Sequence, residues 1–309
     1  MPPLATVIIA TYNWSSVLRH SIGSVLRQTF SDFELLVVGD GCTDDSEGVV
    51  ATMNDPRVRW INLPANTGHQ SAPNNEGLRQ ARGDIIAYLG HDDLWLPHHL
   101  DSIVGALERT RSDLAYSLAI NVGPDGSVWP VIPRPERGSF SSPLSMAHRK
   151  RVTEEMGGWR DYRELEDPPD VELWRRAQAR AYAFAFVPRL TGIKFPARSR
   201  REVYRTRPSH EQAAWLARID GEPDLEMRAL VNVIVDPAGD SWNGMPYRDL
   251  ARNFLRQTLR RIRWRLMLPR LGFSSRPGQT IEDIRRFKGL EKGNDHAARR
   301  AKRLPARNR

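Results

Sequence analysis

The residues best suited to chemistry are two adjacent carboxylates, Asp92 and Asp93, in the segment Gly90–Asp93 that directly follows the apolar run Ile85–Leu89. Neighbouring side chains at a strand end point in different directions, so one carboxylate can hold a divalent cation while the other bonds a sugar hydroxyl. Mg²⁺ and Mn²⁺ are commonly held by few protein carboxylates together with substrate phosphates. On these residues alone, a turn in which Asp93 only caps the next helix is the alternative interpretation.

Polar residues also follow the other strand-like runs. Thr11-Tyr12-Asn13 follows Ala5–Ala10, and Asp40 follows Phe33–Val38. In open α/β sheets, ligands bind where loops leave the carboxyl ends of the strands. The sequence therefore predicts that these polar residues and Asp92 meet at one edge of a sheet.

Strand-like and helix-like segments alternate through the first 110 residues. Strands are predicted at Ala5–Ala10, Phe33–Val38, Arg57–Asn62, Asp84–Leu89 and Asp113–Ile120, and helices after Asn13 or Ser15, from Asp44, at Ser71–Ala81 and after Pro97. This alternation indicates an α/β fold with a mostly parallel sheet flanked by helices. Beyond residue 120, a turn at Asp125-Gly126, a loop over 130–143, a helix at Glu172–Ala181 and a strand at Tyr182–Val187 are predicted.

Composition narrows the class of protein. Hydrophobic residues make up 40% of the 309 residues and charged residues 27%, which is typical of globular proteins. The single cysteine, Cys42, excludes an intrachain disulfide framework, and the sequence shows neither an apolar run of about 18 residues nor a signal-like start. These features predict a cytoplasmic protein. The net charge of +9 arises mainly after Tyr247.

Four segments resemble, in order, the motifs of family 2 glycosyltransferases. They are Val7–Asn13, Val37–Ser46, Asn66–Gly68 with Asn75 and Gly77, and Arg82–Trp95. The resemblance implies a GT-A fold and transfer of a sugar from a UDP, GDP or dTDP donor, as in polysaccharide biosynthesis. It implies a nucleotide-sugar-binding half at 1–115, an acceptor-binding half of the same domain at 116–220, and a basic helical extension with a mobile tail at 221–309.

The resemblance also implies roles for individual residues. Asp92 is expected to hold Mn²⁺ or Mg²⁺, with His210 near the metal or diphosphate. Nucleotide-sugar contacts are implied at Thr11, Tyr12, Asn13, Asp40, Asn66, Gly68, Asn75 and Asp93. Gly39 and Gly90 stand where the family often has aspartate, and Asn74 replaces an arginine. For His91, a solvent-facing imidazole is preferred to a metal ligand.

A catalytic carboxylate is expected in the acidic cluster before Leu173-Trp174. A carboxylate must take the proton of the acceptor hydroxyl, because a hydroxyl is a poor nucleophile. Asp170 best matches the base of the family's inverting members, while Glu172 and Asp167 remain alternatives. A solvated loop that caps a helix is the competing interpretation of this cluster.

Residues 246–268 carry apolar side chains at helical spacing among many arginines. Such a helix either packs on the catalytic domain or lies on anionic lipid, where it could serve a lipid-linked or other glycan acceptor. No nucleic-acid partner is expected, since no recognised binding module appears. The alternative function is that of a catalytically degenerate nucleotide-sugar-binding protein. A nucleotidyltransferase is disfavoured because Thr11–Trp14 lacks the glycine and lysine of a phosphate loop.

Overall fold

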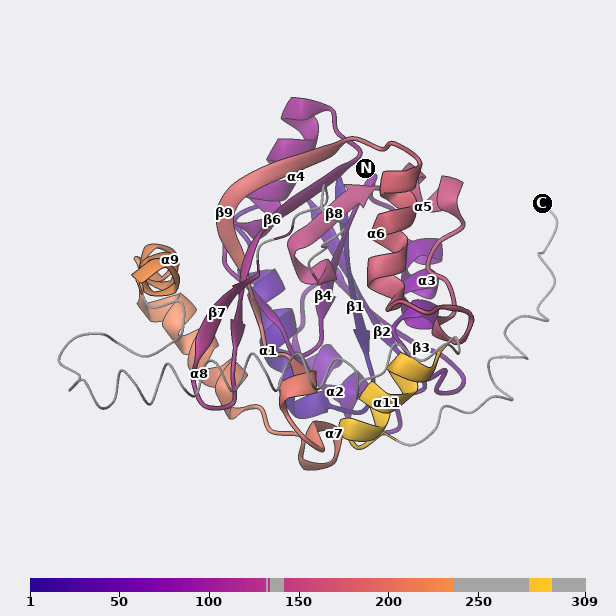
Figure 1. The fold of residues 1–309 in the computed structure, drawn as a ribbon, viewed down its shortest axis with the longest axis vertical. Helices are drawn as coiled ribbons and strands as arrows, with labels where there is room; N and C mark the ends of the chain where they lie inside the picture. Colours follow the sequence, from indigo (N-terminus) through magenta and orange to yellow (C-terminus); the bar gives the residue numbers. More distant parts are fainter. Residues whose placement is uncertain (132, 134–141, 236–277, 291–309) are drawn as a thin grey trace.

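The computed structural model describes residues 1–131, 133, 142–235 and 278–290. These residues form a nine-stranded sheet in the order β3-β2-β1-β4-β8-β6-β9-β5, with β7 paired to β6 (Figure 1). The strands are β1 (Ala5–Thr11), β2 (Phe33–Gly39), β3 (Val58–Asn62), β4 (Ile85–Gly90), β5 (Leu94–Trp95), β6 (Leu114–Val122), β7 (Val128–Val131), β8 (Met146–Arg149) and β9 (Phe184–Lys194).

The register of the parallel strands sets the position of the loops that follow them. Strands β3, β2, β1 and β4 run parallel, with Thr11 opposite Gly39 and Ala10 opposite Gly90. The carboxyl ends of β1, β2 and β4 are therefore level, and the loops after them share one edge of the sheet. Strand β8 is antiparallel to both β4 and β6, and antiparallel pairs also join β7 to β6 and β5 to β9.

Helices cover the sheet on both faces. The described helices are α1 (Ser15–Leu26), α2 (Ser46–Thr52), α3 (Ser71–Gln80), α4 (His99–Thr110), α5 (Lys150–Met156), α6 (Pro169–Ala179), α7 (Val203–Thr206), α8 (His210–Gly221), α9 (Leu225–Val235) and α11 (Gln279–Phe287). Within this described part of the chain, no helix combines the length and the hydrophobicity that crossing a bilayer requires.

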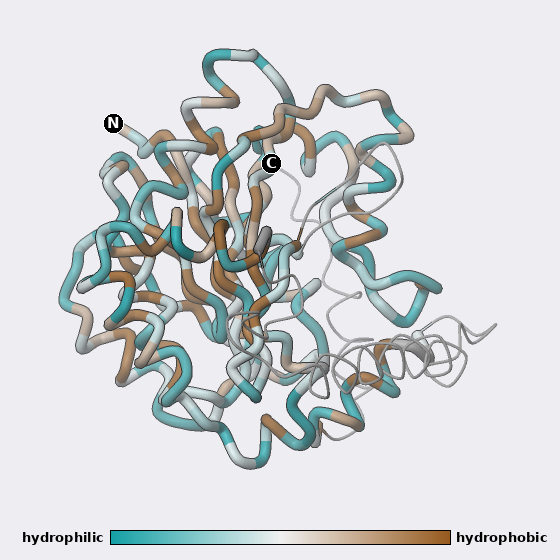
Figure 2. The backbone as a smooth tube through the Cα atoms, turned by 60° about the vertical axis from the view of Figure 1, so that its left-hand side comes forward, coloured by the Kyte–Doolittle hydropathy of each residue, from teal (hydrophilic) through white to brown (hydrophobic). Residues whose placement is uncertain are grey.

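Alternation along the central strands divides the core into two layers. Val7 and Ile9 of β1 pack in the cluster that includes Ile103 of α4, whereas Ile8 packs in the cluster that includes Trp174 of α6. Successive side chains of a strand point to opposite faces, so a strand buried on both faces is apolar throughout. Each fully buried aliphatic side chain contributes about 1.5–3 kcal/mol to folding. Figure 2 shows this apolar concentration in the central strands, with hydrophilic residues on the outer helices.

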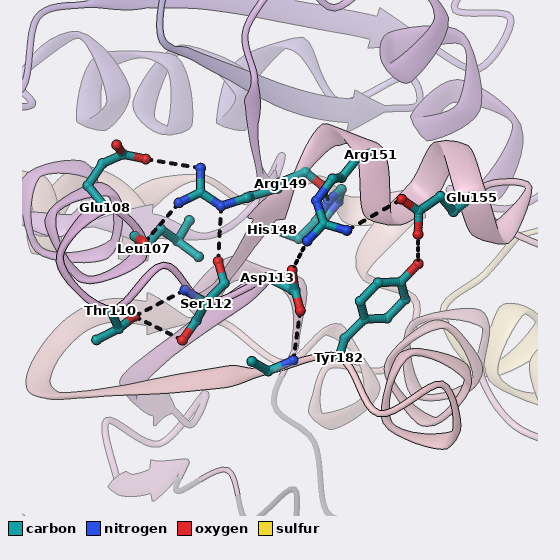
Figure 3. A network of polar contacts seen from close by, with 11 residues as sticks. Leu107, Glu108, Thr110, Ser112, Asp113, His148, Arg149, Arg151, Glu155 and Tyr182 are labelled. Atoms are coloured by element: carbon teal, nitrogen blue, oxygen red, sulfur yellow. Dashed lines mark hydrogen bonds and ion pairs between the residues drawn. The ribbon is translucent and has the colours of Figure 1, made fainter.

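A network of polar contacts connects the elements at the other end of the sheet, away from the loops that follow β1, β2 and β4 (Figure 3). The guanidinium of Arg149 donates to Glu108, at 3.1 Å, and to the carbonyl of Leu107, at 2.9 Å. The carboxylate of Asp113 accepts from Arg151 and from the backbone N–H of Ala183. These contacts join α4, β8 and α5 to the amino ends of β6 and β9, so the sheet edge away from the strand-end loops is held by side chains.

The α/β fold and its mostly parallel first half confirm the expectation from the sequence. Strand β9 is longer than the expected Tyr182–Val187, because it continues to Lys194 beside β6 and β5. The predicted helix at 246–268 and the tail after 290 lie outside the described residues. Within the expected basic extension, α11 returns to the carboxyl end of the parallel strands, where it lies beside α7 in Figure 1.

Candidate active site

A cavity of about 470 Å³ lies at the carboxyl ends of β1, β2 and β4. Its volume falls in the range of about 300–1,000 Å³ that is typical of small-molecule sites. The predicted residues that line it are Thr11, Tyr12, Asp40, Asn66, Gly68, Asp92, Asp93 and Asp170. Residues from both predicted halves and from α11 therefore surround one space.

Asp40 organises the loop that carries Asn66 and Gly68. Its carboxylate accepts the backbone N–H groups of Thr67, at 2.9 Å, and Gly68, at 3.0 Å, and the side-chain amide of Asn66, at 3.1 Å. Burial raises the pKa of Asp40, while the hydrogen bonds from Thr67 and Gly68 oppose that rise. The buried carboxylate of Asp40 thus holds two other predicted contact residues, Asn66 and Gly68, in the loop that forms this wall of the cavity.

His91 is buried, so the expectation of a solvent-facing imidazole is wrong. Its Nδ1 lies 2.9 Å from Thr11 Oγ1 and 3.4 Å from the backbone N of Tyr12, and its Nε2 lies 3.0 Å from Tyr204 Oη. Because a backbone N–H can only donate, Nδ1 is the acceptor and Nε2–H donates to Tyr204. Burial lowers the pKa of His91 to about 4, which keeps the ring neutral. The imidazole therefore ties β1 to the segment around α7.

The two adjacent aspartates have different environments. Asp93 is 1% exposed and accepts the backbone N–H of Phe195, at 2.9 Å, and the ammonium of Lys194, at 3.1 Å. Burial opposes the charge on Lys194, but Asp93 and Asp92 outweigh it and raise the lysine pKa. Asp92 is half-buried, lines the cavity, and its backbone carbonyl accepts from Gln212. Asp93 thus anchors the end of β9, while the Asp92 side chain borders the cavity.

The positions of the Asp92 and Asp93 carboxylates explain why residue 90 is a glycine. A Cβ at position 90 would lie 2.7 Å from Asp93 Oδ2 and 3.2 Å from Asp92 Oδ1. The Asp93 oxygen cannot move away easily, because Lys194 and Phe195 hold the carboxylate. A side chain at position 90 therefore conflicts with the carboxylate pair.

We expect Gly90→Ala to lower the free energy of unfolding by about 1–3 kcal/mol through overpacking. Gly105→Ala is the matched control, since a Cβ in that position of α4 meets no atom within 4 Å. Alanine in a helix interior is favoured over glycine by about 1 kcal/mol, so the control should be neutral or more stable. Denaturant unfolding of both variants measures this. Equal stability of the two would contradict the packing account of Gly90.

The protein ligands that the cavity offers suit a metal ion that is held mainly by the phosphates of a bound substrate. Among the described residues there is no group of three or more His, Cys, Asp or Glu side chains that could hold a metal ion. Asp92 offers one carboxylate in the cavity. Mg²⁺ usually keeps several waters and binds through one or two carboxylates plus substrate phosphates. One carboxylate at the cavity wall fits this mode of binding.

Asp170 differs from the two other carboxylates that the sequence suggested as the base. Asp170 lies in the first turn of α6 and lines the cavity, and burial raises its pKa. Glu172 is ion-paired with Arg160, at 3.1 Å, and with Arg176, at 2.9 Å, and Asp167 is ion-paired with Arg175. Neither Glu172 nor Asp167 is among the residues that line the cavity.

Three other predicted residues lie outside the cavity lining. The Asn13 side chain accepts the backbone N–H of Thr43, at 2.7 Å, and so holds the loop after β2. The Asn75 amide exchanges two 2.8 Å hydrogen bonds with the backbone of Trp159. His210 is exposed at the first residue of α8. The structure does not bring these side chains together with Asp92.

Several cavity residues were not expected from the sequence. They are Asn74, Lys194, Tyr204, Arg285 and Lys288. Asn74 lay inside a recognised segment, but it was considered only as the replacement of an arginine. The other four lie outside every motif and reach the cavity through long-range packing. The apolar spacing of Ile281 and Ile284 was the one local signal that residues 279–287 form a helix with a buried side.

Comparison with known proteins identifies the family. The model of the family described as Glycosyl transferase family 2 matches residues 6–158, which contain Asp40 and the Asp92-Asp93 pair. The chain belongs to glycosyl transferase family 2. The matched part of this family 2 glycosyltransferase runs from β1 to the turn after α5, so Asp170 and α11 lie beyond it.

Curated relatives of this family 2 glycosyltransferase align over about a third of its length. An uncharacterized glycosyltransferase of Nostoc sp. is 41% identical over 101 residues, which are 32% of this chain and 31% of the relative. The Escherichia coli protein WfgD, named UDP-Glc:alpha-D-GlcNAc-diphosphoundecaprenol beta-1,3-glucosyltransferase, is 30% identical over 113 residues, or 37% and 44% of the two chains. The chain thus spans about a third to under half of the length of these relatives.

Solved structures share the fold of this glycosyltransferase over a greater length. Residues 1–349 of TarS from S. aureus, in complex with UDP-GlcNAc, superpose with a TM-score of 0.56 at 19% identity, covering 74% of this chain and 69% of that TarS chain. The mannosyltransferase PcManGT from Pyrobaculum calidifontis, in complex with GDP-Man and Mn²⁺, gives a TM-score of 0.56 at 15% identity, covering 94% and 89%. These similarities establish a GT-A glycosyltransferase fold.

Proposed function

We propose that this protein transfers a sugar from a nucleoside-diphosphate sugar to an acceptor hydroxyl, with Mn²⁺ or Mg²⁺ and with inversion at the anomeric carbon. One observation carries the proposal: a single cavity is lined by Asp92, by Asp170 and by the loop that Asp40 organises. A metal-binding carboxylate, a free base and a nucleotide-binding edge are the three parts that such a reaction needs.

The nucleoside is assigned to the edge formed by Thr11, Tyr12 and the loop 66–68. Asp40 keeps that loop in place through its hydrogen bonds to Thr67 and Gly68. Asp92 is the residue that would hold the metal, whose chemistry is to neutralise negative charge on the donor diphosphate. His91 is not a ligand in this proposal, since both of its ring nitrogens are already engaged.

Asp170 is assigned as the general base. The proton of the acceptor hydroxyl moves to a carboxylate oxygen of Asp170 as the hydroxyl oxygen bonds to the anomeric carbon. The bond from that carbon to the diphosphate oxygen breaks, and the nucleoside diphosphate leaves with its electrons. Attack opposite the leaving group inverts the configuration.

The donor and acceptor classes follow from the relatives. WfgD is named for UDP-Glc and a diphosphoundecaprenol-linked acceptor, TarS was solved with UDP-GlcNAc, and PcManGT was solved with GDP-Man. We propose a UDP- or GDP-sugar donor and a glycan or lipid-linked glycan acceptor.

The alternative function, that of a catalytically degenerate nucleotide-sugar-binding protein, loses its main support. It rested on glycines at positions 39 and 90, where the family often has aspartate. A Cβ at Gly39 would lie 2.5 Å from Asn62 Oδ1, and Gly90 makes room for Asp93. Local packing therefore accounts for both glycines without a loss of catalysis.

Nucleoside diphosphates should raise the melting temperature only when a divalent cation is present. A ligand that binds only the folded state stabilises it by about 2.7 kcal/mol at a hundredfold excess over its dissociation constant. The measurement is thermal melting with UDP or GDP, each with Mn²⁺, with Mg²⁺ or with a chelator. The metal ions alone and the free nucleosides are the controls. The absence of a shift with every nucleotide and metal would overturn the proposed donor site.

A further inference from the structure

Helix α11 forms a wall of the cavity and is fastened at both ends. The N–H of Gly278 donates to the carbonyl of Leu165, at 2.7 Å, and the N–H of Tyr204 donates to the carbonyl of Lys288, at 3.1 Å. In its first turn, Glu282 accepts a 2.6 Å hydrogen bond from Tyr162. These contacts place α11 against the segment before α6 and against α7, so its position over the cavity is fixed from two sides (Figure 1).

This helix presents two cations to the cavity. Ile281, Ile284, Arg285 and Lys288 of the segment line it. The Arg285 guanidinium is buried against the loop that Asp40 organises, since a Cβ at Gly68 would lie 3.0 Å from its Nη1. Arg286, the neighbouring residue, points outward and pairs with Asp283 at 3.5 Å. The helix therefore has one basic residue outside and two inside.

The cations of α11 change the charge of the cavity. Without them, its lining holds four carboxylates and one lysine: Asp40, Asp92, Asp93, Asp170 and Lys194. The histidines in the lining do not offset this, because burial lowers the pKa of His69 to about 3 and that of His91 to about 4. The diphosphate of a sugar nucleotide would enter a strongly negative site. Arg285 and Lys288 remove most of that repulsion.

Lys288 lacks an anionic partner. In the part of the chain that the structure describes, no carboxylate forms a hydrogen bond or ion pair with its ammonium, which lies 6.0 Å from the centre of the Tyr204 ring. Burial lowers the pKa of Lys288, and Asp92 opposes that effect. A half-buried ammonium of this kind gains most from an incoming anion, because a buried charge is costly until it is paired.

We propose that Lys288, together with Arg285, binds the donor diphosphate. The segment of α11 then contributes two positively charged side chains to the diphosphate site, in addition to the metal ion that Asp92 would hold. The inference rests on the proposed donor class and adds residues that lie beyond the segment matched by the family. It makes α11 part of the donor site.

The test compares Lys288→Met with Arg286→Met in the full chain. These variants remove one positive charge each from the same helix, one inside the cavity and one outside. We expect Lys288→Met to weaken binding of UDP or GDP in the presence of Mn²⁺ by roughly tenfold to a hundredfold, as for loss of a charge-assisted hydrogen bond. Arg286→Met should bind like the wild type. Binding of the free nucleoside should be the same in all three proteins, and Lys288→Arg should restore most of the affinity.

The possible results separate this inference from the proposed function. Equal affinity for the diphosphate in Lys288→Met and wild type, or an equal loss in Arg286→Met, would overturn the role of Lys288. If Lys288→Met melts well below Arg286→Met, Lys288→Gln replaces it in the same comparison. A wild-type protein that binds neither UDP nor GDP would overturn the proposed function, and with it this inference.

Discussion

Replacing Asp92 by alanine is expected to reduce sugar transfer by roughly a hundredfold to a thousandfold and to abolish its response to Mn²⁺. Asp92 is the carboxylate assigned to the metal, and removing one group that stabilises charge on a reacting oxygen has effects of about this size. Its neighbour Asp93 is occupied by Lys194 and Phe195, so it cannot replace the lost ligand without releasing the end of β9. Initial rates with and without added metal measure the effect.

The control for this variant is Asp101→Ala, which removes an exposed carboxylate from α4. Surface substitutions of this kind usually change stability by less than about 0.5 kcal/mol. Both variants should melt close to the wild type, because the backbone carbonyl of Asp92, which Gln212 uses, is retained. Full activity of Asp92→Ala, or undiminished wild-type activity in a chelator, would refute the metal role.

Asp170→Asn should bind the donor normally but transfer the sugar about a hundredfold to ten-thousandfold more slowly, the usual range for loss of a general base. The amide keeps the size of the carboxylate but cannot accept the proton of the acceptor. Asp167→Asn is the matched control, since its carboxylate pairs with Arg175 away from the cavity lining. Donor affinity and kcat are measured for both. Normal kcat in Asp170→Asn, with a loss in Asp167→Asn, would move the base to position 167.

The same assignment predicts the acid side of the pH profile. A base acts only when it is ionised, and burial raises the pKa of Asp170 above its ordinary value. The kcat should therefore be constant at neutral pH and fall as the pH drops through this raised pKa. In Asp170→Asn the residual rate should lack that fall. A persistent fall in the variant would assign it to another group.

The strand-end residues were predictable because local chemistry positions them. Apolar runs that become β1, β2 and β4 end at Thr11, Asp40 and Asp92, and the level register of parallel strands brings these ends together. The sequence could not distinguish Asp170 from its neighbours, because the difference lies in the ion pairs of Asp167 and Glu172 with arginines.

Other parts of the site depended on contacts that no local pattern encodes. Asn13 and Asn75 occupy motif positions, but their amides hold backbone segments instead of lining the cavity. His91 was expected in solvent, yet it is buried because Tyr204 comes from far along the chain to meet it. The contribution of α11 was missed for the same reason, since its docking depends on Tyr162, Leu165 and Tyr204.

The origin of α11 late in the sequence affects how the site forms during synthesis on the ribosome. Chains emerge from the amino terminus, so the strands that carry Asp40 and Asp92 can pair long before residues 278–290 are made. A nascent chain would then expose an acidic, open cavity without Arg285 and Lys288. Under the proposed role of Arg285 and Lys288, donor capture would become efficient only after this segment has left the exit tunnel.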